Sequence, residues 1–122
     1  MCIRDRLKTL IKNDNEINDP NNVKVITDNN SNAIYFSRLP LPYNRYGNEI
    51  KYYKHVGIYA FRKKALIKFS NLKKSKLEKA EMIEAIRFIE NGMKIKILEV
   101  KNNYIGIDTI EDLTKARKMF ND

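Results

Sequence analysis

Cysteine is almost absent from this chain of 122 residues, because Cys2 is the only one. A single cysteine excludes an internal disulfide and any zinc site built from several cysteines. Histidine is equally scarce, with His55 alone, which excludes a histidine-rich metal motif. The sequence also shows no glycine-rich phosphate loop and no Ser/His/Asp or Cys/His set, so no common motif for a catalytic nucleophile or a phosphate cradle is present.

Long apolar stretches are missing too. No run approaches the roughly 20 consecutive apolar residues that span a bilayer. The first residues also lack the charged-then-apolar build of a secretory signal. We therefore expect a cytoplasmic protein with no membrane partner.

The residues that are present describe a basic globular domain. Hydrophobic residues make up 43% and charged residues 32%, which is typical of one domain with a real core. The net charge of +9 favours an anionic partner, either nucleic acid or a small anionic substrate. The lysines mostly alternate with apolar residues, as on a solvated face. Tyrosines beside basic residues keep single-strand stacking open as an alternative: Tyr43, Tyr46, Tyr52 and Tyr53.

The first half of the chain predicts a hairpin and a long strand. Residues 23–27 and 33–36 read as two strands joined by the dense turn signal of residues 28–32. Residues 13–22 and 43–51 read as loops, and residues 52–61 form the longest β-type run. Residues 1–6 fit no expected element, so we expect them to be an artefactual N-terminus before a domain portion spanning 7–122. Residues 7–11 read as the remnant of a strand or helix.

The second half predicts helices around one more strand. A short helix is expected over residues 63–69, and Ser75 with Glu78 forms a capping box that opens a second helix. Its expected inner stripe is Leu77, Ala80, Ile83, Ile86 and Ile89. Asn91-Gly92 indicates a left-handed end to that helix, and residues 93–100 alternate as a strand.

The last segment predicts a strand-to-helix switch. Ile105 and Ile107 read as the end of a buried strand, and Thr109 with Asp112 reads as a capping-box variant. The expected inner face of the final helix comprises Ile110, Leu113, Ala116 and Phe120. Asp108 is left at the switch, where α/β proteins usually place ligand chemistry. Asp108 suits a hard cation such as Mg²⁺, and the alternative is that it only caps the helix.

Three more polar residues sit where packing alone explains them poorly. Arg38 leaves a strand into a proline-flanked turn, which suits a guanidinium that grips a carboxylate or phosphate, or else a surface salt bridge. His55 lies in a strand among aromatic residues and reads either as a ligand contact or as a hydrogen-bonded core histidine. Glu84 adjoins the apolar stripe and either faces a polar ligand or pairs with Arg87 on the helix surface.

Several segments, taken together, resemble the C-terminal half of the 3-deoxy-manno-octulosonate (Kdo) cytidylyltransferase family, also known as CMP-Kdo synthetases. They occur in the family's order and spacing from residue 19 to the end of the chain. They are Asp19-Pro-Asn-Asn-Val-Lys-Val25, Ala33-Ile-Tyr-Phe-Ser-Arg38 with Pro40 and Pro42, Lys54-His-Val-Gly-Ile-Tyr-Ala60, Leu77-Glu78 with Glu81, Ile83-Glu-Ala-Ile-Arg87 and Gly106-Ile-Asp-Thr-Ile-Glu-Asp-Leu113.

The resemblance implies an α/β fold of the nucleotide-diphospho-sugar-transferase (Rossmann-like) type with an antiparallel hairpin arm, and a homodimer. It implies the reaction of CTP with Kdo to give CMP-Kdo and pyrophosphate, for lipopolysaccharide synthesis, with Mg²⁺ as cofactor and no nucleic-acid partner. Arg38, His55 and Tyr59 would line the sugar-acid pocket, Glu84 would hydrogen-bond sugar hydroxyls, and Asp108 would help to hold Mg²⁺.

The chain departs from the family's pattern in two respects. Ala85 stands where the family usually has Gln, which leaves 8-amino-Kdo or another acidic sugar as an alternative substrate. The family's Arg-Leu-Pro-Gly-Lys loop and Gln-Gly-Asp-Glu-Pro metal motif have no counterpart in these residues. We therefore expect that this chain alone neither binds CTP well nor turns over. Two further alternatives are a basic nucleic-acid-binding module and a non-catalytic dimerisation fragment.

Overall fold

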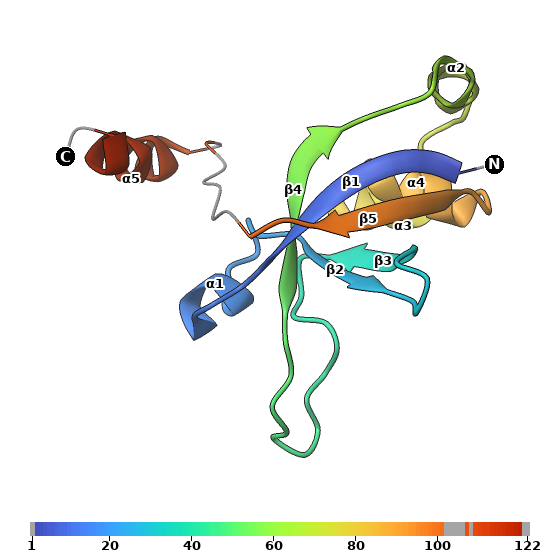
Figure 1. Cartoon of the computed structure of the whole chain (residues 1–122). Helices are drawn as coiled ribbons and strands as arrows, with labels where there is room; N and C mark the ends of the chain where they lie inside the picture. Colours follow the sequence, from blue (N-terminus) through green and yellow to red (C-terminus); the bar gives the residue numbers. More distant parts are fainter. Residues whose placement is uncertain (1, 102–106, 108, 121–122) are drawn as a thin grey trace.

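The computed structural model describes residues 2–101, 107 and 109–120, with the side chains of all of these except 2–5, 58 and 59. Ten elements follow one another along the chain (Figure 1). They are β1 (Cys2–Leu10), α1 (Asp14–Asn18), β2 (Lys24–Thr27), β3 (Ala33–Ser37), β4 (Tyr53–Tyr59), α2 (Lys63–Ser70), α3 (Lys76–Glu81), α4 (Ala85–Glu90), β5 (Lys94–Glu99) and α5 (Ile110–Phe120).

The strands form one mixed sheet in the order β3-β2-β4-β1-β5. β4 lies at its centre, and β1 runs antiparallel to β4 and parallel to the edge strand β5. β2 and β3 pair as the expected antiparallel hairpin, and β2 joins β4 through a single register pair, Lys24 with Lys54. The hairpin tip curls over to β5, where the Ile97 amide donates to the Ser31 carbonyl at 2.8 Å. The sheet is therefore strongly curved.

The core lies between this curved sheet and the helices α3 and α4, which lie together on one of its faces (Figure 1). Phe88 of α4 is fully buried and stacks on Phe69, with ring centroids 4.5 Å apart. Val25 and Phe36 contribute from the hairpin, and Ile95 and Ile97 contribute from β5. Burying these apolar groups is the main favourable term for folding.

The predicted helix over residues 75–90 is wrong in its length, because it breaks at Met82. Met82 has a φ of 57°, and its carbonyl and that of Glu81 accept hydrogen bonds from Arg38 instead of continuing the helix. The break rotates α4 relative to α3, so Ile83 and Ile86 are buried while Leu77 and Ala80 are exposed, contrary to the predicted stripe. The capping box of Ser75 and Glu78 is confirmed.

Two N-terminal expectations are also corrected. Residues 13–22 are not all loop, because Asn13 caps the short helix α1 by accepting from the Glu16 amide at 2.9 Å. Residues 2–6 belong to β1 and pair with β4 and β5, although they were expected to fit no element. Arg6 is buried and lies over the rings of Phe36 and Phe88, because the planar guanidinium stacks well on aromatic faces.

The C-terminal helix begins as predicted but does not bury its predicted face. The Thr109 amide donates to the Asp112 carboxylate and the Asp112 amide donates to the Thr109 hydroxyl, which confirms the capping-box variant. Ala116 is buried, whereas Ile110 and Phe120 are 83% and 87% exposed. α5 stands apart from the sheet (Figure 1), so the described residues offer these side chains no core to enter.

Glu78 and Arg87 form a buried ion pair between α3 and α4. The Arg87 Nη2 and Nε groups donate to the Glu78 carboxylate at 2.5 and 2.8 Å. The Arg87 guanidinium also lies 4.2 Å from the centroid of the Phe69 ring. This pairing lowers the pKa of Glu78 and raises that of Arg87. The alternative that Glu84 pairs with Arg87 on the helix surface is therefore wrong, since Arg87 is directed into the protein.

We predict that Arg87→Met lowers the free energy of unfolding by about 3 kcal/mol, because Glu78 would be left as a buried, uncompensated charge. Urea unfolding of the chain measures this effect. Lys79→Met, on the exposed side of α3, is the matched control and should change stability by less than about 0.5 kcal/mol. Equal effects of the two substitutions would contradict the role of the ion pair.

Candidate functional site

The side chain of Arg38, directly after β3, is held by three hydrogen bonds to backbone carbonyls. Its Nε group donates to the Glu81 carbonyl at 2.7 Å, and its two terminal nitrogens donate to the carbonyls of Pro20 and Met82 at 2.9 and 3.2 Å. Three of the five N–H groups of the guanidinium are engaged in these bonds. The bonds hold the guanidinium plane in one orientation.

Two charged neighbours hold the backbone of Arg38. The Glu81 carboxylate accepts from the Arg38 amide at 2.9 Å and from the Ser37 hydroxyl at 2.7 Å. The Lys24 ammonium donates to the carbonyls of Arg38 and Asp19 at 2.8 and 2.7 Å. We call Lys24, Ser37, Arg38 and Glu81 the Arg38 cluster. It joins the loop before β2, the end of β3 and the end of α3.

Lys24 is the most deeply buried charged residue of the cluster, and none of its surface is exposed. Burial lowers its pKa below the ordinary value, and the Arg38 charge adds to this, whereas Asp19 and Glu81 oppose it. Lysines that alternate with apolar residues were expected to face solvent. Lys24 is an exception because it lies where β2 meets both β3 and β4, so that its side chain is covered.

His55 lies one strand away, on β4. Its ring meets the Phe36 ring edge-on with centroids 5.2 Å apart, and its amide donates to the Val23 carbonyl at 2.7 Å. Burial lowers the pKa of His55 to about 3, and the Arg6 charge contributes further. His55 is therefore a neutral imidazole at physiological pH, able to donate and accept hydrogen bonds but not to act as a cation.

The structure describes the other predicted site residues only in part. Glu84 is exposed directly before α4, two residues after the Met82 carbonyl that Arg38 contacts. Tyr59 ends β4, and its side chain lies outside the described part of the structure. Asp108 lies outside the described residues altogether. Arg38 thus contacts Met82, two positions before Glu84, and His55 contacts Phe36, two positions before Arg38.

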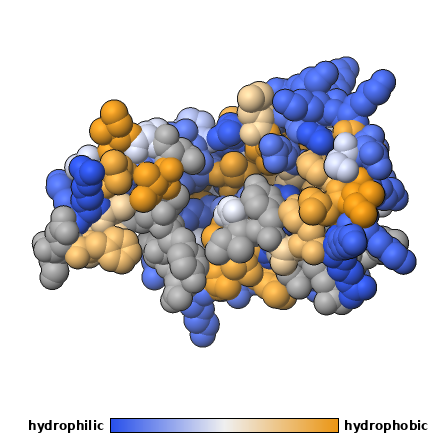
Figure 2. Space-filling model, turned by 90° about the horizontal axis from the view of Figure 1, so that it is seen from above, coloured by the Kyte–Doolittle hydropathy of each residue, from blue (hydrophilic) through white to orange (hydrophobic). Residues whose placement is uncertain are grey.

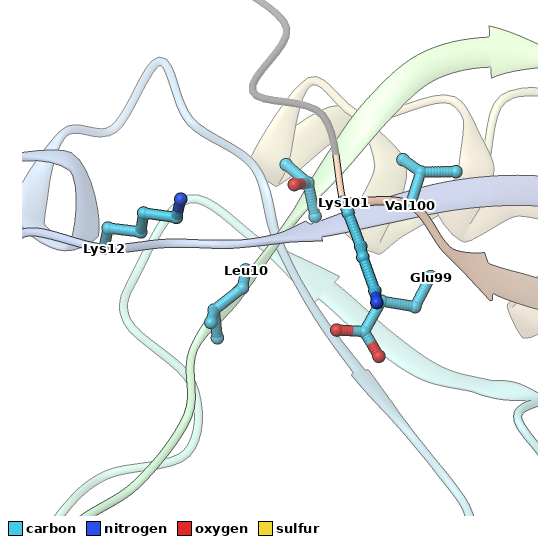
Figure 3. A pocket seen from close by; sticks show the side chains of 6 residues that line it. Leu10, Lys12, Glu99, Val100 and Lys101 are labelled. Carbon is cyan, nitrogen blue, oxygen red and sulfur yellow. The ribbon is translucent and has the colours of Figure 1, made fainter.

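A pocket of about 290 Å³ lies elsewhere, at the carboxyl ends of the parallel strands β1 and β5 (Figure 3). Its lining residues are Thr9, Leu10, Lys12, Glu99, Val100 and Lys101. Among the residues that the structure describes, no three His, Cys, Asp or Glu side chains gather into a metal site. Likewise, none of the described helices is long and apolar enough to cross a membrane.

Comparison with known proteins decides the family. The sequence model of the cytidylyltransferases matches residues 5–95. The chain belongs to the cytidylyltransferase family. The 3-deoxy-manno-octulosonate cytidylyltransferases of Christiangramia forsetii and Flavobacterium johnsoniae are 54% and 49% identical to it over 114 and 113 residues. These matches cover 93% and 92% of this chain, but 46% of each relative.

The fold agrees with that assignment. A solved CMP:2-keto-3-deoxy-manno-octonic acid synthetase, complexed with CTP, superposes with a TM-score of 0.86 at 38% identity. The match covers 96% of this chain and 48% of that structure. The predicted α/β nucleotide-sugar-transferase type of fold is therefore confirmed, and this cytidylyltransferase chain spans about half the length of the relatives that it matches.

Sequence reasoning did not assign a role to Lys24 or to Glu81. Both side chains act through contacts with residues distant in the sequence: Lys24 binds the carbonyl of Arg38, 14 positions away, and Glu81 binds the Arg38 amide, 43 positions away. The resemblance to the family includes both positions, and this was the only signal that they matter. The positions of Lys24 and Glu81 within the predicted strand and helix gave no such signal.

The neutral state of His55 predicts a pH-dependent stability. The folded-state pKa lies below the ordinary 6.5, so the unfolded chain binds the proton more tightly and stability falls as pH drops from about 6.5 towards 3. At pH 5 the loss due to His55 is about 2 kcal/mol relative to pH 7.5. Between pH 7.5 and pH 5, the His55→Gln variant should therefore lose about 2 kcal/mol less stability than the unsubstituted chain. Urea unfolding of both proteins at each pH measures this, and identical pH slopes would contradict a neutral His55.

Proposed function

We propose that this chain is the C-terminal portion of a sugar-acid cytidylyltransferase that activates Kdo with CTP, giving CMP-Kdo and pyrophosphate in the cytoplasm for lipopolysaccharide synthesis. The superposition on a CTP-complexed synthetase, over 96% of the chain, is the observation that carries this proposal. In this reaction the anomeric hydroxyl of the sugar attacks the α-phosphate of CTP. A new C–O–P linkage forms while the bond to pyrophosphate breaks, and the hydroxyl proton is lost.

Arg38 binds the sugar carboxylate in this proposal. The Arg38 cluster fixes the guanidinium before the ligand arrives, so little side-chain entropy is lost on binding. The two N–H groups beyond the three that contact carbonyls suit the two oxygens of a carboxylate. The cluster thus supplies a preorganised cationic group to an acidic sugar.

His55, Tyr59 and Glu84 position the sugar hydroxyls. A neutral imidazole and a phenol each donate and accept hydrogen bonds, whereas the exposed Glu84 carboxylate accepts them. The ring contact of His55 with Phe36 orients the imidazole in the same part of the sheet as Arg38. These groups bind and orient the sugar without transferring charge to it.

Asp108 helps to hold Mg²⁺, whose positive charge offsets the charge that develops on the phosphate oxygens. A carboxylate oxygen is the type of donor that Mg²⁺ prefers. The family's remaining metal motif has no counterpart in this chain.

The identity of the acidic sugar depends on position 85. Ala85 stands where the family usually has Gln, and its methyl side chain offers no polar group to a ligand. An 8-amino-Kdo or another acidic sugar is therefore the alternative substrate. A homodimer accompanies the proposal, with its arm contributed by the hairpin region and the loop after it, where Tyr43 and Tyr46 are exposed.

A chimera tests the proposed function. Residues 2–122 are joined to the part of the Christiangramia forsetii relative that this chain does not match, and CMP-sugar formation from CTP and Kdo is measured with Mg²⁺. We expect the chimera to turn over, and the 122-residue chain alone to give no product. Turnover by the chain alone, or none by a folded chimera, would contradict the proposal.

Substitutions in the same chimera test the residue roles. Arg38→Met should raise the KM for Kdo at least about tenfold, since a charge-assisted hydrogen bond contributes about 1.5–3 kcal/mol, while the KM for CTP stays nearly constant. Lys64→Met, on the exposed surface of α2, is the matched control. Equal changes in both KM values would remove Arg38 from the carboxylate site.

A further inference from the structure

The helix α2 turns apolar side chains towards solvent. Ala65 is fully buried and Phe69 stacks on the Phe88 ring, so these two side chains define the inner side of the helix. At about 100° per residue, Ile67 lies on the opposite side, about 160° from each of them. Ile67 and its neighbour Leu66 are 52% and 50% exposed. The way in which α2 packs on the core therefore leaves this apolar pair at the surface.

Positive charge surrounds the apolar pair. The exposed cations directly before α2 and within it are Arg62, Lys63, Lys64 and Lys68. Three more exposed lysines follow closely, at positions 73, 74 and 76. The only acidic residue between positions 62 and 79 is Glu78, which is buried and paired with Arg87. We call Arg62, Lys63, Lys64, Leu66, Ile67 and Lys68 the α2 surface.

The α2 surface lies away from α5, at the other end of the molecule (Figure 1). Figure 2 shows apolar side chains bordered by hydrophilic ones at that end. Neighbouring apolar side chains with a polar rim are typical of an interaction site, whereas single exposed apolar residues are not.

The cations at the start of α2 do not stabilise the helix. The N-terminal end of a helix carries partial positive charge, which favours acidic residues in the first turn. The first turns of α1, α3 and α5 contain acidic residues, but that of α2 contains Lys63 and Lys64 and no acidic residue. In the described structure, the N-cap residue Arg62 makes no capping hydrogen bond through its side chain. An anionic partner therefore accounts for these cations better than local helix stability does.

The surface of a bilayer with anionic lipids fits this combination of groups. Its phosphate-bearing headgroups attract clusters of four or more cations on an amphipathic helix. Its acyl boundary receives apolar side chains, while the lysine ammonium groups stay among hydrated headgroups. We propose that the α2 surface binds the surface of a bilayer that contains anionic lipids, with Leu66 and Ile67 inserted at the headgroup boundary. This inference goes beyond the proposed function and does not rest on it.

The expectation of no membrane partner rested on the absence of a spanning run and of a secretory signal. A peripheral contact requires neither, because side chains on the surface of a folded domain make it. The charge and the exposed apolar pair of α2 are the observations that bear on such a contact.

Other occupants fit the α2 surface less well. A protein partner would have to desolvate several lysines, and lysine is depleted at protein interfaces. A second copy of this chain, with its own α2 surface, would bring like charges together. A single-stranded nucleic acid stacks its bases on exposed aromatic side chains, and the α2 surface contains none.

Co-sedimentation with vesicles measures the binding. The probes are vesicles of phosphatidylcholine alone and vesicles of equal parts phosphatidylcholine and phosphatidylglycerol. At roughly 0.1 M salt, the chain should partition onto the anionic vesicles at least about tenfold more strongly than onto the neutral ones, and less strongly as salt is raised. Equal partitioning onto the two kinds of vesicle would overturn the inference.

A double substitution tests the cations. Lys63→Gln/Lys64→Gln should weaken partitioning onto the anionic vesicles at least about tenfold, since each cation near such a surface contributes about fivefold. Lys115→Gln/Lys118→Gln is the matched control, because it removes the same charge from the exposed side of α5. The control should weaken partitioning less than about twofold. Equal weakening by the two variants would show that net charge, and not the α2 surface, attracts the vesicles.

A second double substitution tests the apolar pair. Leu66→Gln/Ile67→Gln keeps every charge and changes only exposed positions, so the chain should stay folded, which far-ultraviolet circular dichroism checks. Its partitioning onto the anionic vesicles should be at least about tenfold weaker, because the inserted apolar groups are lost. Partitioning as strong as that of the unsubstituted chain would contradict insertion and overturn the inference.

Two further measurements distinguish the other occupants. Fluorescence anisotropy with a single-stranded RNA oligonucleotide should show the same binding for the Leu66→Gln/Ile67→Gln variant as for the unsubstituted chain. RNA binding that the Lys63→Gln/Lys64→Gln variant loses, without vesicle binding by the unsubstituted chain, would assign the α2 surface to nucleic acid. The chimera should bind the anionic vesicles as the chain does, and loss of binding would show that the other half covers α2. Either result overturns the inference, and neither measurement requires turnover.

Discussion

The buried ammonium of Lys24 is the constraint on which the site depends. It connects the Asp19 carbonyl to the Arg38 carbonyl, and so ties the loop before β2 to the end of β3. A charge without exposed surface is tolerated only when hydrogen bonds replace its hydration. The carbonyls of Asp19 and Arg38 provide those bonds, and the ammonium in turn fixes the backbone of Arg38, while the Glu81 carbonyl holds its guanidinium.

The same cluster explains the shape of the helical layer. The guanidinium of Arg38 donates hydrogen bonds to the carbonyls of Glu81 and Met82, and the chain turns at Met82 instead of continuing as one helix. The turn places α4 with Phe88 in the core and presents Glu84 at its start. Residues proposed to bind the sugar are thus arranged by the contacts that shape the fold. A local substitution in the cluster is expected to disturb both.

Local patterns in the sequence were sufficient to predict most elements. The hairpin, β4, α2, β5 and the capping of α3 and α5 follow from turn residues, alternation and caps, which act over a few positions. The break at Met82 was missed because it depends on Arg38, more than 40 residues earlier. The exposure of Ile110 and Phe120 was missed for a related reason: an amphipathic pattern predicts an apolar face but not whether a partner is there to cover it.

The residue types of the site could be predicted from the sequence, but the contacts that hold these residues in place could not. Arg38 and His55 stood out as a guanidinium at a rigid turn and a lone histidine in a strand. That His55 is neutral follows from its burial and from Arg6, and that Arg38 is immobile follows from Lys24 and Glu81. Such contacts arise only when distant segments pack together. A resemblance to a family can indicate these positions, but their physical role requires the structure.

The exchange rate of the Arg38 Nε–H proton, followed by NMR, tests the central claim most directly. A guanidinium held by the Glu81 carbonyl should keep this proton protected in the native chain, while the exposed Arg45 and Arg62 exchange rapidly. The account predicts that Lys24→Met, in a chain that remains folded, abolishes this protection. Rapid exchange of the Arg38 proton in the unsubstituted chain, or full protection in the Lys24 variant, would contradict it.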